Sequence, residues 1–132
     1  MKRVIKKFTD GKLDGRYLVY LDEQLIERGK YELGKKERLW VRYYKNGNIK
    51  SERYYSNDKL SDFYNFYYPT GEIFVTGEFS DNKRVGEWRF YDKNKKIKIN
   101  SEFIEISYQE QLKSKADAFA SLFHQLTEVF KE

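Results

Sequence analysis

Regularly spaced tyrosines are the residues in this sequence whose type and spacing best fit a chemical role. Tyr43, Tyr67 and Tyr91 follow one another at a constant interval, and Tyr20 precedes Tyr43 by an interval one residue shorter. Tyrosine presents a large ring and a hydroxyl group while losing little side-chain entropy, so it is favoured at protein interfaces. The series therefore indicates either a binding surface or a set of cross-strand pairs that stabilise a sheet. The sequence supports these two interpretations about equally.

Charged and aromatic residues near these positions extend the series into a candidate binding site. We expect this site to consist of the four tyrosines and five flanking residues: Tyr20, Tyr43, Tyr67, Tyr91, Lys50, Glu52, Phe74, Arg89 and Lys98. Charged side chains beside tyrosine rings are typical of surfaces that bind another protein. A protein partner is therefore the first hypothesis for this site.

Residues that could perform catalysis are scarce. The chain has no cysteine, and its one histidine, His124, lies in a helical pattern where a surface position is the simpler interpretation. No serine stands in a G-x-S-x-G elbow, and the glycines are scattered instead of forming a phosphate-binding loop. Acidic pairs such as Asp22-Glu23 fall at predicted turns, and no pair stands out as a two-carboxylate hydrolase site, although that class stays open. We expect no enzyme activity, no catalytic residue, no metal site and no cofactor.

The tyrosines are part of a longer internal repeat. The interval that separates Tyr43, Tyr67 and Tyr91 also separates the members of two further sets: Trp40, Tyr64 and Trp88, and Ile49, Ile73 and Ile97. An upstream copy is one residue shorter and holds Tyr17, Tyr20, Ile26 and Tyr31. Turn-rich connectors separate the copies: TDGKLDG, ELGKKER, SNDKLSD and SDNKRVG. A fixed period of a few tens of residues predicts a repeat architecture.

Each copy is predicted to form two short antiparallel strands joined by a tight turn. Asn46-Gly47 tolerates the positive φ angles of a two-residue hairpin turn, so Tyr44 should pair with Ile49 and Tyr43 with Lys50. Residues that pair directly share a face of the sheet. Tyr43 and its equivalents should therefore point away from Ile49 and its equivalents.

Burial indicates which face forms the core. The face that carries Ile49 is mostly apolar and holds Trp40, Tyr44, Ile49, Tyr55, Tyr64, Phe66, Ile73, Phe79, Trp88, Phe90, Ile97 and Phe103. We predict that this face is buried and that the tyrosine series faces solvent. A one-residue slip would exchange the two faces and make the tyrosines core. Two hairpin tips lack the glycine: Lys95 stands in its place in the fourth copy, and residues 22–24 suggest a longer loop in the first.

A helical pattern replaces the strand pattern after Phe103. Apolar residues recur at intervals of three and four over residues 107–130: Leu112, Ala116, Phe119, Phe123, Leu126 and Phe130. Ser107 and Glu110 fit a capping box at its start. We expect this helix to pack on the chain's own aromatic face, where it would bury Phe119, Phe123 and Leu126. The alternative is a helix that dimerises or enters the groove of a partner.

The predicted fold is mainly β: an elongated antiparallel meander of about four hairpin repeats with one C-terminal amphipathic α-helix. The array spans residues 1–106 and supplies about eight strands, in units at about 8–30, 31–54, 55–78 and 79–103. The helix occupies residues 107–132 and packs on or caps the sheet, because a single-layer sheet cannot hide its apolar face alone.

Three segments resemble the MORN-variant repeat of bacteria: LWVRYYKNGNIKSERYY (39–55), YNFYYPTGEIFVTGEF (64–79) and GEWRFYDKN (86–94). The shared order is G-x-W-x-x-Y-x-x-x-G-x-I, and the resemblance covers residues 8–103. Gly15 and Gly86 match its first glycine, whereas the second and third units have Arg38 and Asp62 there. The resemblance implies consecutive MORN-like hairpins in a curved sheet, and a binding module. Small bacterial proteins of this kind are commonly labelled antitoxins, so it also implies a partner such as a cognate toxin that the chain neutralises by surface contact, as an immunity protein does.

The net charge of +5 suggests a second class of partner. Residues 93–98 hold four lysines and no acid, and residues 1–7 hold four more bases. Lysines at hairpin tips and sheet edges usually prevent edge pairing, and we favour this interpretation. The alternative is a basic, aromatic-flanked patch that binds an anionic lipid surface or nucleic acid, and such binding would fall steeply with salt.

The basic start, MKRVIKKFTDGK, is not followed by an apolar segment, and no run reaches transmembrane length. We therefore predict a cytoplasmic protein, unless a signal peptide was removed. The 132 residues suffice for one domain, which we expect to be a monomer or a weak homodimer.

Overall fold

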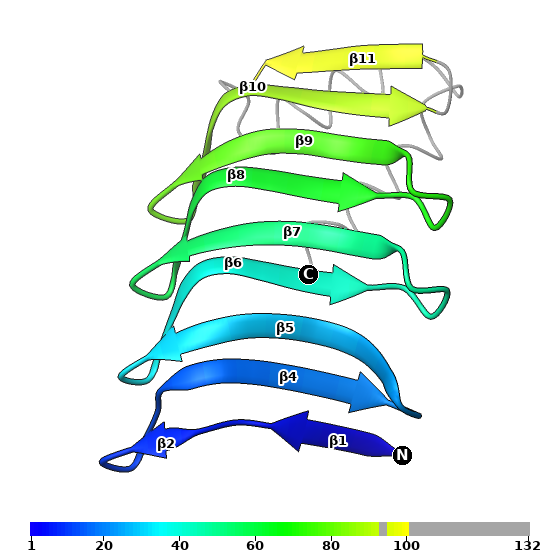
Figure 1. Ribbon diagram of the computed structural model, residues 1–132. Helices are drawn as coiled ribbons and strands as arrows, with labels where there is room; N and C mark the ends of the chain where they lie inside the picture. The colour runs from blue at the N-terminus through cyan, green and yellow to red at the C-terminus, as the bar shows by residue number, and fades with distance from the viewer. Residues whose placement is uncertain (93–94, 101–132) are drawn as a thin grey trace.

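A computed structural model describes residues 1–92 and 95–100, with side chains described for residues 1–91. In this part, each strand of the main sheet pairs with the next one along the chain (Figure 1). Eight consecutive strands form an antiparallel meander: β4 (Gly15–Leu21), β5 (Gln24–Glu32), β6 (Lys35–Tyr43), β7 (Ile49–Ser56), β8 (Lys59–Tyr67), β9 (Ile73–Ser80), β10 (Lys83–Asp92) and β11 (Lys95–Asn100). The predicted mainly β fold with an antiparallel meander is confirmed.

The N-terminal residues add a strand that the sequence pattern did not predict. β1 (Lys2–Ile5) pairs with β4 and makes the sheet nine-stranded. β2 (Phe8–Thr9) and β3 (Lys12–Leu13) form a short hairpin of their own between these two strands. The predicted helix over residues 107–130 and the predicted end of the last unit at residue 103 lie outside the described residues.

Two-residue turns join neighbouring strands at one end of the strands, on the left in Figure 1. Both residues of each turn have positive φ, as in a type I′ hairpin turn, at Leu33-Gly34, Asn57-Asp58 and Asp81-Asn82. Asn and Asp tolerate this conformation, so it forms even where glycine is missing. The second residue of each turn donates its N–H to a carbonyl just after the preceding turn, at 2.6–3.0 Å: Gly34 to Leu13, Asp58 to Lys36 and Asn82 to Leu60.

Turns at the opposite end of the strands differ from the predicted ones. The N–H of Gly47 donates to the carbonyl of Tyr44 at 3.0 Å, and the N–H of Tyr44 donates to the carbonyl of Asn48 at 2.8 Å. Gly47 has a φ of 91°, so the loop is a type I turn followed by a left-handed glycine and not a two-residue turn. Gly71 closes the next loop in the same way.

The prediction of a longer loop at residues 22–24 is also wrong. Asp22 and Glu23 form a two-residue turn between β4 and β5, with φ angles of 49° and 67°. This turn is one residue shorter than the loop at residues 45–47, which accounts for the shorter first copy.

The buried face is organised by tryptophan rings that pack directly on glycine. Trp40 and Trp88 are 1% and 2% exposed. A Cβ atom added at Gly29 would lie 2.1 Å from the Trp40 ring, and one at Gly77 would lie 2.2 Å from the Trp88 ring. Because protein interiors have no spare volume for such an atom, each tryptophan requires the glycine beside it.

Arg53 and Tyr64 take the corresponding places in the unit between the two tryptophans, where they pair directly. Arg53 is 6% exposed, and its guanidinium group lies 3.2 Å from both the carboxylate of Glu27 and the hydroxyl of Tyr55. A buried charge is tolerated when it is paired in this way. Lys36 lies nearby, where burial, followed by repulsion from Arg53, lowers its pKa. The aromatic core therefore contains a charged cluster formed by side chains of its first and second units.

A residue with positive φ recurs two positions before the core-facing aromatic residue of each unit. The φ angles of Gly15, Arg38, Asp62 and Gly86 are 112°, 62°, 56° and 69°. The backbone thus keeps a positive φ at all four positions, although only two carry glycine. A residue with a Cβ atom is strained there by roughly 1–2 kcal/mol, so the surrounding strand pairing must impose it.

Replacing Arg38 with glycine should stabilise the fold. The change removes the strain of a left-handed non-glycine residue, and we expect the free energy of unfolding to rise by about 1 kcal/mol in urea denaturation. The control is Lys35→Gly, at an exposed strand position without positive φ, which should lower stability by about 0.5–1 kcal/mol. Equal destabilisation by both changes would contradict the assignment of strain.

Gly77→Ala should destabilise the fold by about 3 kcal/mol, because its methyl group would overlap the Trp88 ring. Adding Trp88→Tyr should recover part of this loss, since the smaller ring is the one found opposite Arg53. Thermal unfolding of the single and double variants measures both effects. An unchanged melting temperature in Gly77→Ala would contradict the close packing of Trp88 on Gly77.

Candidate functional site

A β-bulge determines which side chains share a face with the tyrosines. Away from the loop, β6 and β7 pair in the predicted register, but next to the loop Tyr43 pairs with Ile49 and leaves Lys50 as an extra residue. Tyr67 pairs with Ile73 across the same irregularity between β8 and β9. Since paired residues share a face, the isoleucines lie on the tyrosine side. The prediction that they point to opposite sides is wrong.

Two predicted site residues leave the tyrosine side for the same reason. Phe74 is 3% exposed, and its ring centroid lies 4.8 Å from that of Tyr68 and 6.1 Å from that of Phe66. The Nζ atom of Lys50 lies 5.9 Å from the centroid of the Tyr44 ring. Both residues therefore belong to the other side of the sheet.

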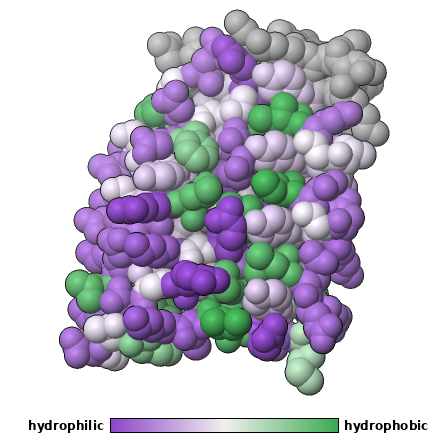
Figure 2. Space-filling view, viewed as in Figure 1, coloured by the Kyte–Doolittle hydropathy of each residue, from purple (hydrophilic) through white to green (hydrophobic). Residues whose placement is uncertain are grey.

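The surface that carries the tyrosines, here called the tyrosine face, has three rows of side chains that cross the strands. The tyrosine row alternates aromatic and aliphatic residues, all partly exposed: Tyr20, Leu25, Tyr43, Ile49, Tyr67, Ile73 and Tyr91. The second row is called the polar row because five of its seven members are polar. The strand pairing places in it Leu18, Arg28, Val41, Glu52, Asn65, Thr76 and Arg89. The outer row lies two residues from the polar row on each strand, on the side away from the tyrosine row. It contains Arg16, Lys30, Leu39, Tyr54, Phe63, Glu78 and Glu87. Figure 2 shows green and pale side chains alternating up the sheet.

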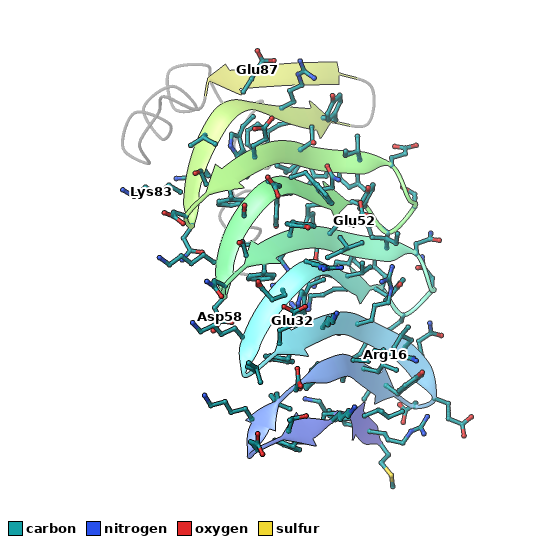
Figure 3. All side chains as sticks on the ribbon, turned by 60° about the vertical axis from the view of Figure 1, so that its left-hand side comes forward. Arg16, Glu32, Glu52, Asp58, Lys83 and Glu87 are labelled. Carbon is teal, nitrogen blue, oxygen red and sulfur yellow. The ribbon has the colours of Figure 1, made fainter. Side chains whose placement is uncertain are left out.

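Glu52 is the centre of a hydrogen-bond network on this face, and Figure 3 labels it. Its Oε1 atom accepts a hydrogen bond from the hydroxyl of Tyr67 and another, at 3.3 Å, from Nδ2 of Asn65. The hydroxyl of Thr76 donates to Oδ1 of Asn65 at 2.8 Å. Side chains from three adjacent strands are thus fixed relative to one another.

Two further tyrosines of the row, Tyr20 and Tyr43, contact arginines. The Nε atom of Arg28 donates to the hydroxyl of Tyr43 at 2.9 Å. The guanidinium carbon of Arg3 lies 4.7 Å from the centroid of the Tyr20 ring, a cation–π contact. The polar contact of the tyrosine row is therefore basic at Tyr20 and Tyr43 and acidic at Tyr67.

Arg89 lies on the tyrosine face as predicted, in an ion pair with Glu87 at 2.9 Å. Lys98 pairs with Arg89 through the backbone of β11, but its side chain lies outside the described residues. Tyr91 is partly exposed at the end of the tyrosine row.

Burial, followed by the hydrogen bond to Glu52, raises the pKa of the Tyr67 hydroxyl to about 12. Both causes act in the same direction, because a phenolate beside a carboxylate would be repelled as well as desolvated. Tyr67 therefore stays neutral and keeps donating to Glu52 over the physiological pH range.

Three residues that order the site were missing from the predicted set: Arg28, Asn65 and Thr76. A signal for two of them exists in the sequence, since Arg28 and Thr76 lie one repeat period before and one after Glu52. This position carries a different polar side chain in each unit, so it does not look like a repeat until the strands are paired.

Within residues 1–92 and 95–100, no group of three or more His, Cys, Asp or Glu side chains is placed to hold a metal ion. The same part of the chain contains no helix long and apolar enough to cross a membrane. The sequence matches no protein-family model, and a comparison with curated proteins also found no match.

Tyr67→Phe should make stability less dependent on pH in the alkaline range. The folded state keeps the Tyr67 proton up to about pH 12, whereas the unfolded chain loses it near the ordinary value of 10.0. This contribution is complete below pH 10 and is lost as pH rises to about 12, so the free energy of unfolding should fall over that interval. The fall should be shallower in Tyr67→Phe and also reduced in Glu52→Gln. Urea denaturation at several pH values measures the slopes, and equal slopes in all three proteins would refute this role for Tyr67.

Proposed function

We propose that this chain is a non-enzymatic protein-binding module that uses the tyrosine face as its contact surface. The observation that supports this most directly is the fixing of partly exposed tyrosines before any partner arrives, through Arg28 on Tyr43 and Glu52 on Tyr67. Side chains that are already ordered lose little entropy on binding, which favours affinity. The sheet holds them at a spacing of roughly 10 Å for every second strand.

The composition of the tyrosine face fits the same proposal. Tyrosine and arginine are the residues most enriched where proteins contact each other. The face also exposes Phe63 and Val85, at 40% and 36%, next to charged neighbours. Exposed apolar groups surrounded by charged residues are typical of protein interaction sites.

The resemblance to the MORN-variant repeat narrows the proposal to an antitoxin or immunity protein. In this form, the array of about four repeats blocks a cognate toxin in the cytoplasm by surface contact. The chain would need no cofactor for this task, because the partner is neutralised by occlusion and not by chemistry.

The double variant Tyr43→Ala, Tyr67→Ala should abolish partner capture and leave the melting temperature within about 5 °C of the wild type. Immobilised proteins are compared by capture from extracts of the native cell, followed by binding to the purified partner. The control is Lys59→Ala, Lys83→Ala at the exposed hairpin edge, which should capture as the wild type does. A large loss of melting temperature instead would show that the tyrosine row serves the sheet and not a partner.

Salt separates this function from binding of an anionic lipid surface or nucleic acid. Exposed bases at Lys2, Arg3, Lys6 and Lys7 line the β1 end of the chain and motivate the comparison. Binding that depends on phosphates weakens steeply between low and moderate salt, whereas tyrosine-mediated contacts change little. A steep loss of capture with salt would favour the polyanion.

A further inference from the structure

We propose that a second copy of this chain is the protein partner that fits the tyrosine face. The two copies pack face to face with their strands aligned and their strand order reversed, about a two-fold axis that passes between β6 and β7. This inference rests on the proposed binding role of the tyrosine face and names the occupant of that face when no toxin is bound.

Charge is distributed unevenly over the tyrosine face. Among the described side chains of its three rows and of β1, the basic residues other than Arg89 lie at the N-terminal end of the sheet, on β1, β4 and β5, and the acidic residues lie on β7, β9 and β10. Lys30 is neutralised by Glu32 at 3.3 Å, and Glu87 by Arg89 at 2.9 Å. The remaining charges are basic at one end and acidic at the other: Arg3, Arg16 and Arg28, then Glu52 and Glu78. Reversing the strand order brings unlike charges together, whereas equal order would oppose like charges.

Arg16 and Glu78 are the most direct test of this match. They stand in the outer row on β4 and β9, which are equally far from the axis between β6 and β7. Both are exposed, and neither has an ion-pair partner among the described residues. The two-fold operation places Arg16 of one copy across from Glu78 of the other, and the same contact occurs twice in the dimer.

The shape of the tyrosine row favours the same arrangement. Because it alternates ring and aliphatic side chain, reversal about an axis between Tyr43 and Ile49 sets every tyrosine of the two middle units against an aliphatic residue. Tyr43 then meets Ile49, and Tyr67 meets Leu25. A ring against a smaller aliphatic group interdigitates, whereas ring against ring would hold the sheets apart.

The tyrosine face is also large enough for a stable dimer. The eight strands from β1 to β10 in the main sheet extend for about 40 Å at 4.8 Å per strand, and three rows of side chains extend for about 20 Å along them. One copy therefore offers roughly 800 Å², which is the contribution of each partner to a stable interface of ordinary size.

A charge-swap experiment on the full chain tests the arrangement by sedimentation velocity over a range of concentrations. The wild type should form a dimer. Arg16→Glu alone and Glu78→Arg alone should each weaken the dimer by about tenfold or more, because each change places like charges at both symmetric contacts. An equimolar mixture of these two variants should dimerise again, since each mixed dimer contains two attractive pairs. The double variant Arg16→Glu, Glu78→Arg should also dimerise.

Controls with the same change in net charge lie beyond the three rows of the tyrosine face. The first control is Lys83→Glu, at a residue that follows a hairpin turn and is labelled, like Arg16, in Figure 3. The second is Glu72→Arg, in the loop after Tyr68. Neither should alter the dimer. The inference is overturned if the wild type stays monomeric, or if the mixture of the two variants stays as monomeric as its components. A monomeric wild type whose capture of a different protein still requires Tyr43 and Tyr67 would overturn this inference alone and leave the proposed function standing.

Discussion

The extra residue in β7 and β9 is the constraint on which both faces of the sheet depend. Side chains alternate along a strand, so an inserted residue reverses the side of everything between it and the loop. Ile73 therefore joins the tyrosine row, and Phe74 turns to the other side, where it packs against Tyr68 and Phe66. Without the bulge, the large phenylalanine ring would interrupt the tyrosine face, and the regular alternation of ring and aliphatic group would be lost.

The hairpins, their period and the direction of the tyrosines could all be predicted from the sequence. They rest on the spacing of aromatic residues and on a register that holds away from the loops. The bulge could not be predicted, because Asn46-Gly47 fits both a two-residue turn and a type I turn closed by a left-handed glycine. Lys50 and Phe74 occupy the inserted position in successive units and differ in polarity, so no shared pattern marks the side they take.

The tryptophan–glycine contacts show a signal that was present but not recognised. Gly29 stands as far before Trp40 in the sequence as Gly77 stands before Trp88. The intervening unit changes both members together, to Arg53 and Tyr64, as expected if the ring and the opposing side chain compete for one volume. Paired changes inside one chain thus identify a contact without any alignment. They also explain why a charged cluster can enter an aromatic core there: the smaller ring leaves room for Arg53, which in turn requires Glu27.

A perfectly repeated face would have a weakness as a binding surface, because a partner could shift by one unit, roughly 10 Å, and make the same contacts. The polar row removes this ambiguity. Its equivalent positions carry Arg28, Glu52 and Thr76, so the backbone repeats while the charge does not. Arg28 and Glu52 bond the hydroxyls of Tyr43 and Tyr67 directly, so that the ring supplies contact area while its polar neighbour supplies register. The repeat therefore builds the surface, and departures from the repeat give that surface a direction.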